Sequence, residues 1–534
     1  MSVLSLIFLA VLLTTCVCCV ALSARRIVCQ ETFLSDIKIL GVLLFICILG
    51  FSIRLWGEPH RKHIYYDEFT YLSVAQNIAH QGVAGVTLKG DSFYSEVMAE
   101  SNRPVGYALV AALAYILGRN LNRDVLFLNV FLGTILILVI FRIAWLVFEN
   151  RVTALWSGIF VMILSPCVAF SACAGADMTA FFFFLLACQF FLEWFRRRER
   201  LFLLTAVFLV CYSAYVKPEY GVLALIGTIL FLMVISRRKD WQEVVKSDSI
   251  FAMICLSLPL LFRSFLMVQQ ESLHAQSFFW GPHHFLNHLF PNGRYLLGQL
   301  PLAMALLAAV FRFSFKNKIL LGLWAWFLGG FVLVSGYFFP LKHWPTQERH
   351  FLLFLPALIL LGSDAIGSFL GKVKYGRVWG VMLFLMIIFY EISSQGMLEK
   401  FFFKRAGHES EEILFVNNMT RDETGGFEAN GHLGDPLLLT MALPMIPDDA
   451  YVLYEQPDFI VTQSSKKALD ASLFLNGDRP LKIACFKGFL WPGREGLMEG
   501  VLAREYACKT VSMLPVPGRT RPFSVDVCTR RVKG

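Results

Sequence analysis

The sequence has 534 residues, of which 57% are hydrophobic and only 16% are charged. Soluble domains carry about 25% charged residues, so this composition excludes an ordinary soluble protein and predicts a polytopic membrane protein. The net charge of +9 does not indicate a nucleic-acid partner, because Lys and Arg in a membrane protein mostly mark the cytoplasmic loops.

Apolar runs that could cross a bilayer recur along most of the chain. A transmembrane helix needs about 17–25 such residues. The first run is followed by Arg25 and Arg26 but preceded by no basic residue, so we expect an uncleaved helix rather than a signal peptide. Twelve runs are candidate spans: 3–22, 38–55, 124–147, 152–171, 178–195, 201–216, 219–236, 248–267, 295–312, 319–338, 351–370 and 378–395.

The positive charges test this list, because cytoplasmic loops are enriched in Lys and Arg. If all the basic clusters are cytoplasmic, the spans alternate without conflict, provided that the shorter apolar run 103–118 does not cross. That run then lies at the outer interface. The first outer loop is 56–122. We therefore expect a multi-pass protein of the bacterial inner membrane or an equivalent plasma membrane. The clusters are Arg25/Arg26, Arg142 to Arg151, 196–200, 237–239, 312–318 and 372–377.

The tail, residues 396–534, mixes charge, Gly and Pro with short β-like runs such as YVLYE and LKIACF. It is long enough for one small soluble domain, which we predict to be α/β or mostly β and extracytoplasmic. One pair among Cys485, Cys508 and Cys528 could form a disulfide in an oxidising compartment and leave the third cysteine over. The predicted division is an N-terminal helix and linker (1–37), a transmembrane domain (38–395) and this tail.

Two adjacent carboxylates, Asp67 and Glu68, stand in the stretch HIYYDEFTYLSVAQNIAHQG, directly after a predicted span. Apolar residues recur there every three or four positions, which predicts an amphipathic helix along the outer interface. The two acids could simply face water or cap that helix, because many loop carboxylates have no further role.

Other polar residues fall at helix ends on the same predicted face. Solvation explains each of them singly, but it does not explain why the outer ends combine acids and bases while the inner ends are nearly all basic. Polar residues at such depths are costly and often functional. Cations there could hold a phosphate, and a carboxylate could accept a proton from a hydroxyl or amine. The residues are Asp177, Lys217, Glu219, Glu348, Arg349 and His350.

Three histidines, His283, His284 and His288, stand in the predicted outer loop 268–294 and include a pair four residues apart. They could bind a metal, but no cysteine or acid with supporting spacing accompanies them. We therefore predict no metal site.

Several stretches resemble the GT-C glycosyltransferases, in particular the protein mannosyltransferase and aminoarabinose transferase (glycosyltransferase family 39-like) superfamily. YYDEFTYLSVAQNIAHQG resembles the first outer loop of that family. NRPVGYALVAALAYILGRN, SPCVAFSACAGADMTAFFFFLLA, YVKPEYG and QERHFLLFLPALILLG follow in the family's order, over roughly residues 38–370. His350 stands where the family often has Tyr, and SACAGAD lacks the usual Arg before its acid.

The resemblance implies an all-α GT-C fold of about twelve transmembrane helices and an inverting sugar transfer from a polyprenyl-phosphate donor. Asp67 would be the general base or would orient the acceptor nucleophile, and Glu68 would shape the same pocket. Lys217 and Arg349 would hold the donor phosphate. No cofactor or metal is required, because Lys and Arg can stabilise a phosphate leaving group. The residues implied for the sugar or acceptor are Asp177, Tyr71, Arg103, Glu219 and His350.

The acceptor could be a protein, a lipid or a glycan, and the tail is a candidate for binding it. Two rival functions remain open from the sequence. A flippase or transporter of a lipid-linked sugar would place its polar residues near mid-bilayer on discontinuous helices, whereas here they gather at outer helix ends. A non-catalytic assembly protein would need no acidic pair.

Overall fold

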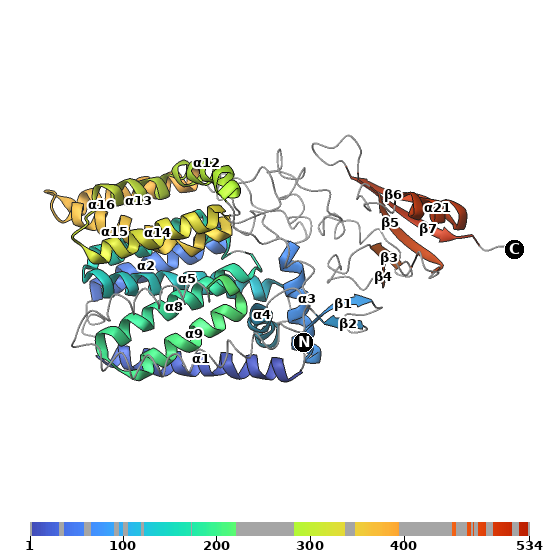
Figure 1. Cartoon of the computed structure of the whole chain (residues 1–534), viewed down its shortest axis with the longest axis horizontal. Coiled ribbons are helices and arrows are strands. Elements are labelled where there is room, and N and C mark those ends of the chain that lie inside the picture. The colour runs from blue at the N-terminus through green and yellow to red at the C-terminus, as the bar shows by residue number, and fades with distance from the viewer. Residues whose placement is uncertain are drawn as a thin grey trace.

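The structure is a computed structural model. It describes residues 3–30, 37–57, 66–89, 96–99, 105–118, 122–171, 173–220, 282–336, 348–394, 451–454, 467–470, 474, 479–487, 495–514 and 523–531. Figure 1 shows long helices side by side along the longest axis, with α3 (Tyr66–Gln81), α4 (Gly106–Leu117) and a C-terminal sheet toward one end. The predicted span 248–267, residues 221–236 of the predicted span 219–236, and most of the predicted tail lie outside the described residues.

Within the described ranges, five helices are long and apolar enough to cross a membrane. They confirm the predicted spans that begin at residues 3, 38, 124, 178 and 319. Four further predicted spans contain shorter apolar helices, and the total of about twelve remains a prediction. The five are in α1 (Val3–Gln30), α2 (Ile37–Ser52) with its π-helical end (Ile53–Gly57), α5 (Asn122–Phe148), α8 (Ala176–Arg197) and α14 (Lys318–Gly336); the shorter helices are α6 (Arg151–Ile163), α9 (Arg200–Val216), α15 (Leu355–Leu370) and α16 (Gly376–Ser394).

Two predicted spans are wrong as continuous helices. The run 152–171 is divided at Leu164 into α6 and the short α7 (Ser165–Ala169), because Pro166 has no N–H to donate and restricts the residue before it. The run 295–312 is divided at Gln299 into α12 (Pro282–Gly298) and α13 (Leu300–Phe311), which are bent by 99° relative to each other. Pro301 lies in the first turn of α13, where proline favours a helix start.

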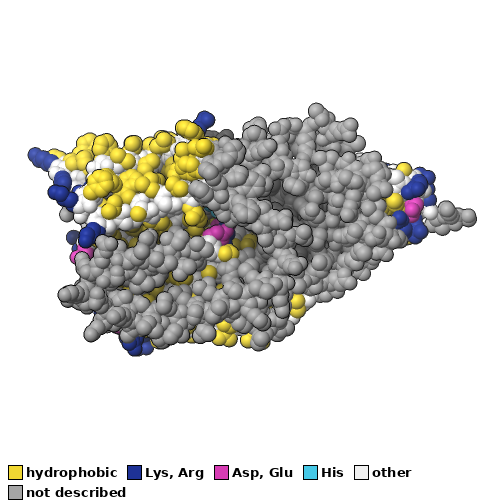
Figure 2. Space-filling view, viewed as in Figure 1, with side chains coloured by type: hydrophobic (Ala, Val, Ile, Leu, Met, Phe, Trp, Pro, Cys, Tyr) yellow, Lys and Arg dark blue, Asp and Glu magenta, His cyan; other side chains and the backbone are white. Residues whose placement is uncertain are grey.

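Four helix connections lie together at one end of the bundle, which we call the basic end: 149–150, 198–199, 312–317 and 371–375. Arg196 lies 3.6 Å from Glu149 and joins the first two connections, and Gly367 at the end of α15 packs on Thr153 at the start of α6. Arg312 reaches Asp364 near the end of α15. Figure 2 shows Lys and Arg side chains at this end, opposite α3 and the sheet. The pairs α5/α6, α8/α9, α13/α14 and α15/α16 therefore turn back at this end, while the topology of the chain in the membrane remains a prediction.

The predicted helix after the first span is present as α3, with Tyr71, Leu72, Ala75 and Ile78 buried. The predicted amphipathic pattern does not leave the polar side exposed, because polar Asn77 is also only 1% exposed. The position of the helix along the outer interface remains a prediction. The hairpin of β1 (Gly85–Lys89) and β2 (Glu96–Ala99) follows. The next helix, α4, has 12 residues, or about 18 Å of helix, which is too short to cross a bilayer.

The described part of the tail forms a five-stranded mixed sheet in the order β4-β3-β5-β7-β6. A small core of Phe474, Ile483, Val501 and Tyr506 packs between the sheet and α21 (Glu495–Glu505). This part of the chain therefore combines a sheet with a helix, while a separate extracytoplasmic domain over 396–534 remains a prediction. The strands are β3 (Tyr451–Tyr454), β4 (Lys467–Asp470), β5 (Lys482–Lys487), β6 (Tyr506–Leu514) and β7 (Phe523–Arg530).

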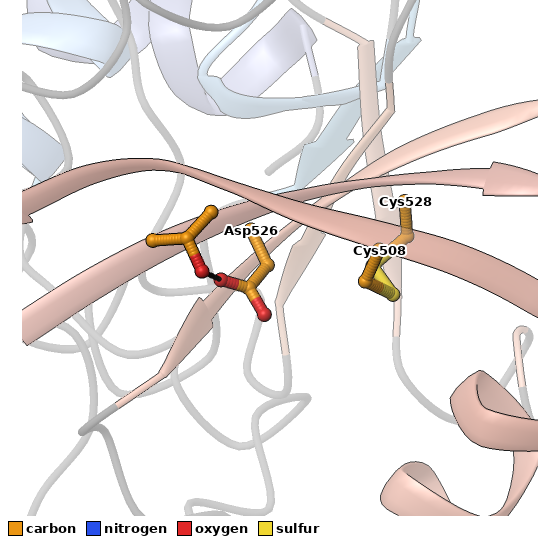
Figure 3. Close-up of a disulfide and its surroundings, with 4 residues drawn as sticks. Cys508, Asp526 and Cys528 are labelled. Atoms are coloured by element: carbon orange, nitrogen blue, oxygen red, sulfur yellow. Dashed lines mark hydrogen bonds between the residues drawn. A yellow bond between two sulfur atoms is a disulfide. The ribbon is translucent and has the colours of Figure 1, made fainter.

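Cys508 and Cys528 form a disulfide between directly opposed positions of β6 and β7, and Cys485 is a buried free thiol on β5. Figure 3 shows the disulfide beside Asp526, whose carboxylate accepts a hydrogen bond of 2.7 Å from the Thr510 hydroxyl. The prediction of one pair and one left-over cysteine is confirmed within this sheet.

Replacing both Cys508 and Cys528 by Ser should destabilise the sheet by about 3 kcal/mol, because the disulfide closes a loop whose chain entropy is then regained on unfolding. Limited proteolysis of the tail under oxidising conditions measures this effect. Cys485→Ser is the matched control, and an equal loss of protease resistance in that variant would contradict the role of the disulfide.

Candidate active site

The ends of α8 and α9 that lie away from the basic end carry opposite charges. Helix α9 ends at Val216 because Pro218 disfavours the helical conformation at Lys217, which is extended at φ −147° and ψ 119°. Helix α8 starts after Gly175, which places Asp177 in its first turn. An acid at a helix N-terminus and a cation at a C-terminus each complement the helix dipole.

Lys217 donates to the Asp177 carboxylate, and both side chains are largely buried. Glu219 follows two residues later, and in the described part of the chain no group donates a hydrogen bond to its buried Oε2. The buried Tyr220 ring packs against Phe184 of α8, with centroids 5.3 Å apart. Two carboxylates and one cation thus lie at the ends of one antiparallel helix pair. The ion pair alone could serve only to join the helices, whereas the unsatisfied oxygen is the feature expected of a site that receives a ligand.

Close backbone contact brings α4 to the same helix end. A side chain at Gly106 would lie 2.7 Å from the backbone of Tyr215, so only glycine allows this approach. The Tyr212 hydroxyl donates a 2.8 Å hydrogen bond to the Gly106 carbonyl oxygen. Because α3 packs along α4, the helix that carries Asp67 and Glu68 is connected through α4 to the end of α9 that carries Lys217.

A buried hydrogen-bond network centred on Asn129 of α5 holds the start of α8. Its amide nitrogen donates to the Tyr107 hydroxyl (2.9 Å) and to the Cys173 carbonyl (2.6 Å), and its oxygen accepts from Thr179 (3.1 Å). The Tyr107 ring meets Tyr71 of α3 edge to face, with centroids 5.2 Å apart. The network therefore links α3, α4, α5 and α8. Sequence reasoning missed Asn129, although an amide in the run LFLNVFLG was a visible signal.

The structure places the backbone of the predicted carboxylates but not their side chains. Asp67 and Glu68 lie in the first turn of α3, and the positions of their side chains lie outside the described atoms. Tyr71, one turn later, is buried against Tyr107. Arg103 lies outside the described residues.

Arg349, the second predicted phosphate-binding cation, lies in a short 3-10 helix, η4 (Glu348–Leu353). This helix packs against α8 and α14. The side chain of Arg349 lies outside the described atoms, while the neighbouring His350 is buried. The Trp326 indole of α14 donates a 2.9 Å hydrogen bond to the Leu353 carbonyl and anchors η4. This segment thus comes to α8, the helix that carries Asp177.

Of the three histidines, only His288 has a described side chain. Its Nδ1 lies 3.2 Å from the Ser335 carbonyl oxygen, in a buried contact between α12 and α14. In the described part of the chain, no group of three His, Cys, Asp or Glu side chains is arranged to hold a metal.

Arg54 is a second buried group that sequence reasoning missed. Its guanidinium is completely buried and donates to the Val161 (2.8 Å), Met162 (3.3 Å) and Gly50 (3.0 Å) carbonyls and to the Ser171 hydroxyl (3.2 Å). These carbonyls lie at the C-terminal ends of α6 and α2, where a cation is favourable. Arg54 joins the two helices just before the segment that carries Asp67.

Comparison with known proteins identifies the fold. No protein-family model and no curated protein matches the sequence. The crystal structure of ArnT from Cupriavidus metallidurans in the apo state aligns with a TM-score of 0.55 at 13% identity, over 91% of this chain and 97% of ArnT. This chain has the GT-C fold. The structure of the same ArnT bound to undecaprenyl phosphate aligns with a TM-score of 0.51 at 12% identity, over 93% of this chain and 98% of ArnT.

The GT-C fold confirms the fold that the sequence motifs predicted. Together with the long apolar helices, it makes this chain an integral membrane protein. Identities of 12–13% show shared architecture only, so the chemistry of the site is argued below from the residues of this chain.

Proposed function

We propose that this GT-C protein is an inverting membrane glycosyltransferase that moves a sugar from a polyprenyl-phosphate donor to an acceptor on the extracytoplasmic face. The observation that carries the proposal is the Lys217–Asp177 pair beside the unsatisfied Glu219 oxygen, at the end of the bundle where α3 lies. The fold shared with ArnT, whose structure was solved with undecaprenyl phosphate bound, supports a lipid phosphate as the donor.

In the proposed reaction, the two carboxylates of α3 act on the acceptor. Asp67 takes the proton of an acceptor hydroxyl or amine, whose oxygen or nitrogen attacks the anomeric carbon of the sugar from the side opposite the phosphate. The bond between that carbon and the phosphate oxygen breaks, and the electron pair leaves with the polyprenyl phosphate. The geometry of such a single displacement inverts the anomeric configuration. Glu68 shapes the pocket of the same nucleophile.

Lys217 and Arg349 stabilise the phosphate as its charge increases, which is the electrostatic contribution that this leaving group needs. Asp177 and Glu219 face the sugar or the acceptor, with Tyr71, Arg103 and His350 as further lining residues. When the phosphate binds, Lys217 keeps its contact with Asp177 and donates a second hydrogen bond to the phosphate. Both buried charges therefore remain paired, as buried charges require.

A reconstituted assay separates transfer from transport. Proteoliposomes are supplied with polyprenyl-phosphate sugars and with candidate protein, lipid and glycan acceptors. We expect free polyprenyl phosphate and glycosylated acceptor to form in equal amounts. Movement of the intact donor between leaflets, without cleavage of the sugar–phosphate bond, would instead identify a flippase.

Lys217→Met should raise the KM for the polyprenyl donor by about 10–100-fold, the effect of losing a hydrogen bond to a charged group. Because this change also leaves Asp177 unpaired, the matched variants are Asp177→Asn and the double variant. If Lys217 holds the phosphate, the double variant keeps the high KM while Asp177→Asn alone does not. A double variant with the wild-type KM would show that Lys217 only neutralises Asp177.

A further inference from the structure

Helix α12 is amphipathic in the opposite sense to a helix on the surface of a soluble protein. Its polar residues His288 and Asn292, four positions apart, are buried against α14, where the Asn292 amide donates a 2.9 Å hydrogen bond to the Ser335 hydroxyl. Its outward face carries Leu286, Phe290 and Leu297, which are 64%, 80% and 58% exposed.

The outward residues form one continuous stripe. Positions 286, 290, 293 and 297 are three or four residues apart, so they share one face of the helix. A side chain at Gly293 would meet nothing within 4 Å, which confirms that this face is open. Leaving a Leu or Phe side chain in water instead of burying it costs about 1.5–3 kcal/mol, so a stripe of this kind indicates a hydrocarbon environment.

This stripe is continuous with the apolar surface of the bundle. Figure 2 shows hydrophobic side chains over the region where Figure 1 places α12, α13 and α14. Val310 of α13 and Val332 of α14 are among the large exposed side chains there. Because α12 is bent by 99° from α13, the two helices are nearly perpendicular and α12 does not continue the direction of α13.

One cation stands beside the stripe. Arg294 is exposed, lies four residues after Phe290 and three before Leu297, and within the described part of the chain forms no salt bridge. A long cationic side chain beside an apolar face places its stem on hydrocarbon and its charge at the headgroups. Apolar contact and positive charge together match an anionic phospholipid.

We propose that α12 is embedded in the leaflet opposite the basic end and docks bilayer phospholipid, with acyl chains on the Leu286, Phe290 and Leu297 stripe and a headgroup phosphate at Arg294. The polar side of the helix is satisfied by α14, so the helix enters the apolar layer without exposing His288 or Asn292 to it. The Tyr295 ring of α12 packs against Phe351 of η4, with centroids 5.0 Å apart, so this docking surface borders the segment that carries Arg349. The proposal itself does not rest on the proposed sugar transfer.

Photo-crosslinking in proteoliposomes tests the proposal. The full chain carries p-benzoylphenylalanine at position 290 in phosphatidylcholine vesicles, and irradiated protein is analysed by mass spectrometry. We expect a phospholipid adduct at that position. The matched control is the same probe at Leu481, which is 60% exposed in the C-terminal region and should give no lipid adduct. A probe at 290 that remains unreacted with lipid, or that reacts with another protein, overturns the proposal.

A second arm tests the cation. In vesicles that contain both lipids, the yield of phosphatidylglycerol adduct per mole of that lipid should be about fivefold higher than the yield of phosphatidylcholine adduct. This is the effect of one basic residue near an anionic surface. Arg294→Gln should abolish this preference and Arg294→Lys should keep it. An equal preference in the wild type and in Arg294→Gln would overturn the assignment of the phosphate to Arg294.

Discussion

Asp67→Asn abolishes most sugar transfer while the protein still folds and inserts into the membrane: this is the largest change in activity that we expect. The amide has nearly the shape of the carboxylate but cannot accept the proton of the attacking group. General-base catalysis contributes about 10²–10⁴-fold, so kcat in the reconstituted assay should fall by about that factor. The KM for the polyprenyl donor should change little, because Asp67 acts on the acceptor.

Glu68→Gln is the matched control, since it removes the adjacent carboxylate from the same turn of α3. We expect a much smaller fall in kcat for this variant. Thermal unfolding of both variants in detergent should match the wild type. Full transfer activity in Asp67→Asn would remove Asp67 from the mechanism, and a larger loss in Glu68→Gln would transfer the role of base to Glu68.

Glu193→Ala should cause the largest loss of stability. Glu193 is completely buried near the basic end of α8, and its carboxylate accepts hydrogen bonds of 2.7 Å from Arg142 and 2.8 Å from Arg197. Removing the carboxylate leaves the buried Arg142 guanidinium without this partner. Breaking a buried pair from one side costs about 3–5 kcal/mol, which should appear as a clear decrease in the thermal midpoint in detergent.

The exposed pair of Glu149 and Arg196, at the same end of the bundle, supplies the control. Glu149→Ala should cost no more than about 1 kcal/mol, because water screens both charges. The double variant Arg142→Met/Glu193→Met should recover part of the lost stability, since it also removes the buried cation. Equal midpoints for Glu193→Ala and Glu149→Ala would show that the buried charge of Arg142 is compensated in another way.

Local sequence patterns predicted several elements correctly. The apolar repeat after Tyr66 predicted α3, and uninterrupted apolar runs predicted the long helices α1, α2, α5, α8 and α14. These predictions succeed because a helix in a bilayer must satisfy its backbone hydrogen bonds within its own segment. The basic clusters predicted which connections of the described helices lie together at the basic end, since charge is excluded from the apolar layer.

The same composition could not distinguish a straight span from a broken one. The runs 152–171 and 295–312 are mostly apolar, and hydropathy does not show whether the helix axis bends within such a run. Pro166 and Pro301 were visible signals, but proline can also be tolerated within a transmembrane helix when neighbouring groups satisfy the freed backbone. Packing between helices determines how α12 is placed: its polar residues His288 and Asn292 contact Ser335 of α14, so the polar side faces inward.

The sequence by itself determined the class of protein, the positions of most described helices and the helix ends that carry acids and bases. It did so because apolar length, proline position and the placement of charge act within a few neighbouring residues. Only the tertiary structure decided that Lys217 meets Asp177, that Asn129 joins α5 to the start of α8, and that Arg54 closes the ends of α2 and α6. Those contacts join residues from different helices, so they depend on which faces pack together, and no local pattern encodes that choice.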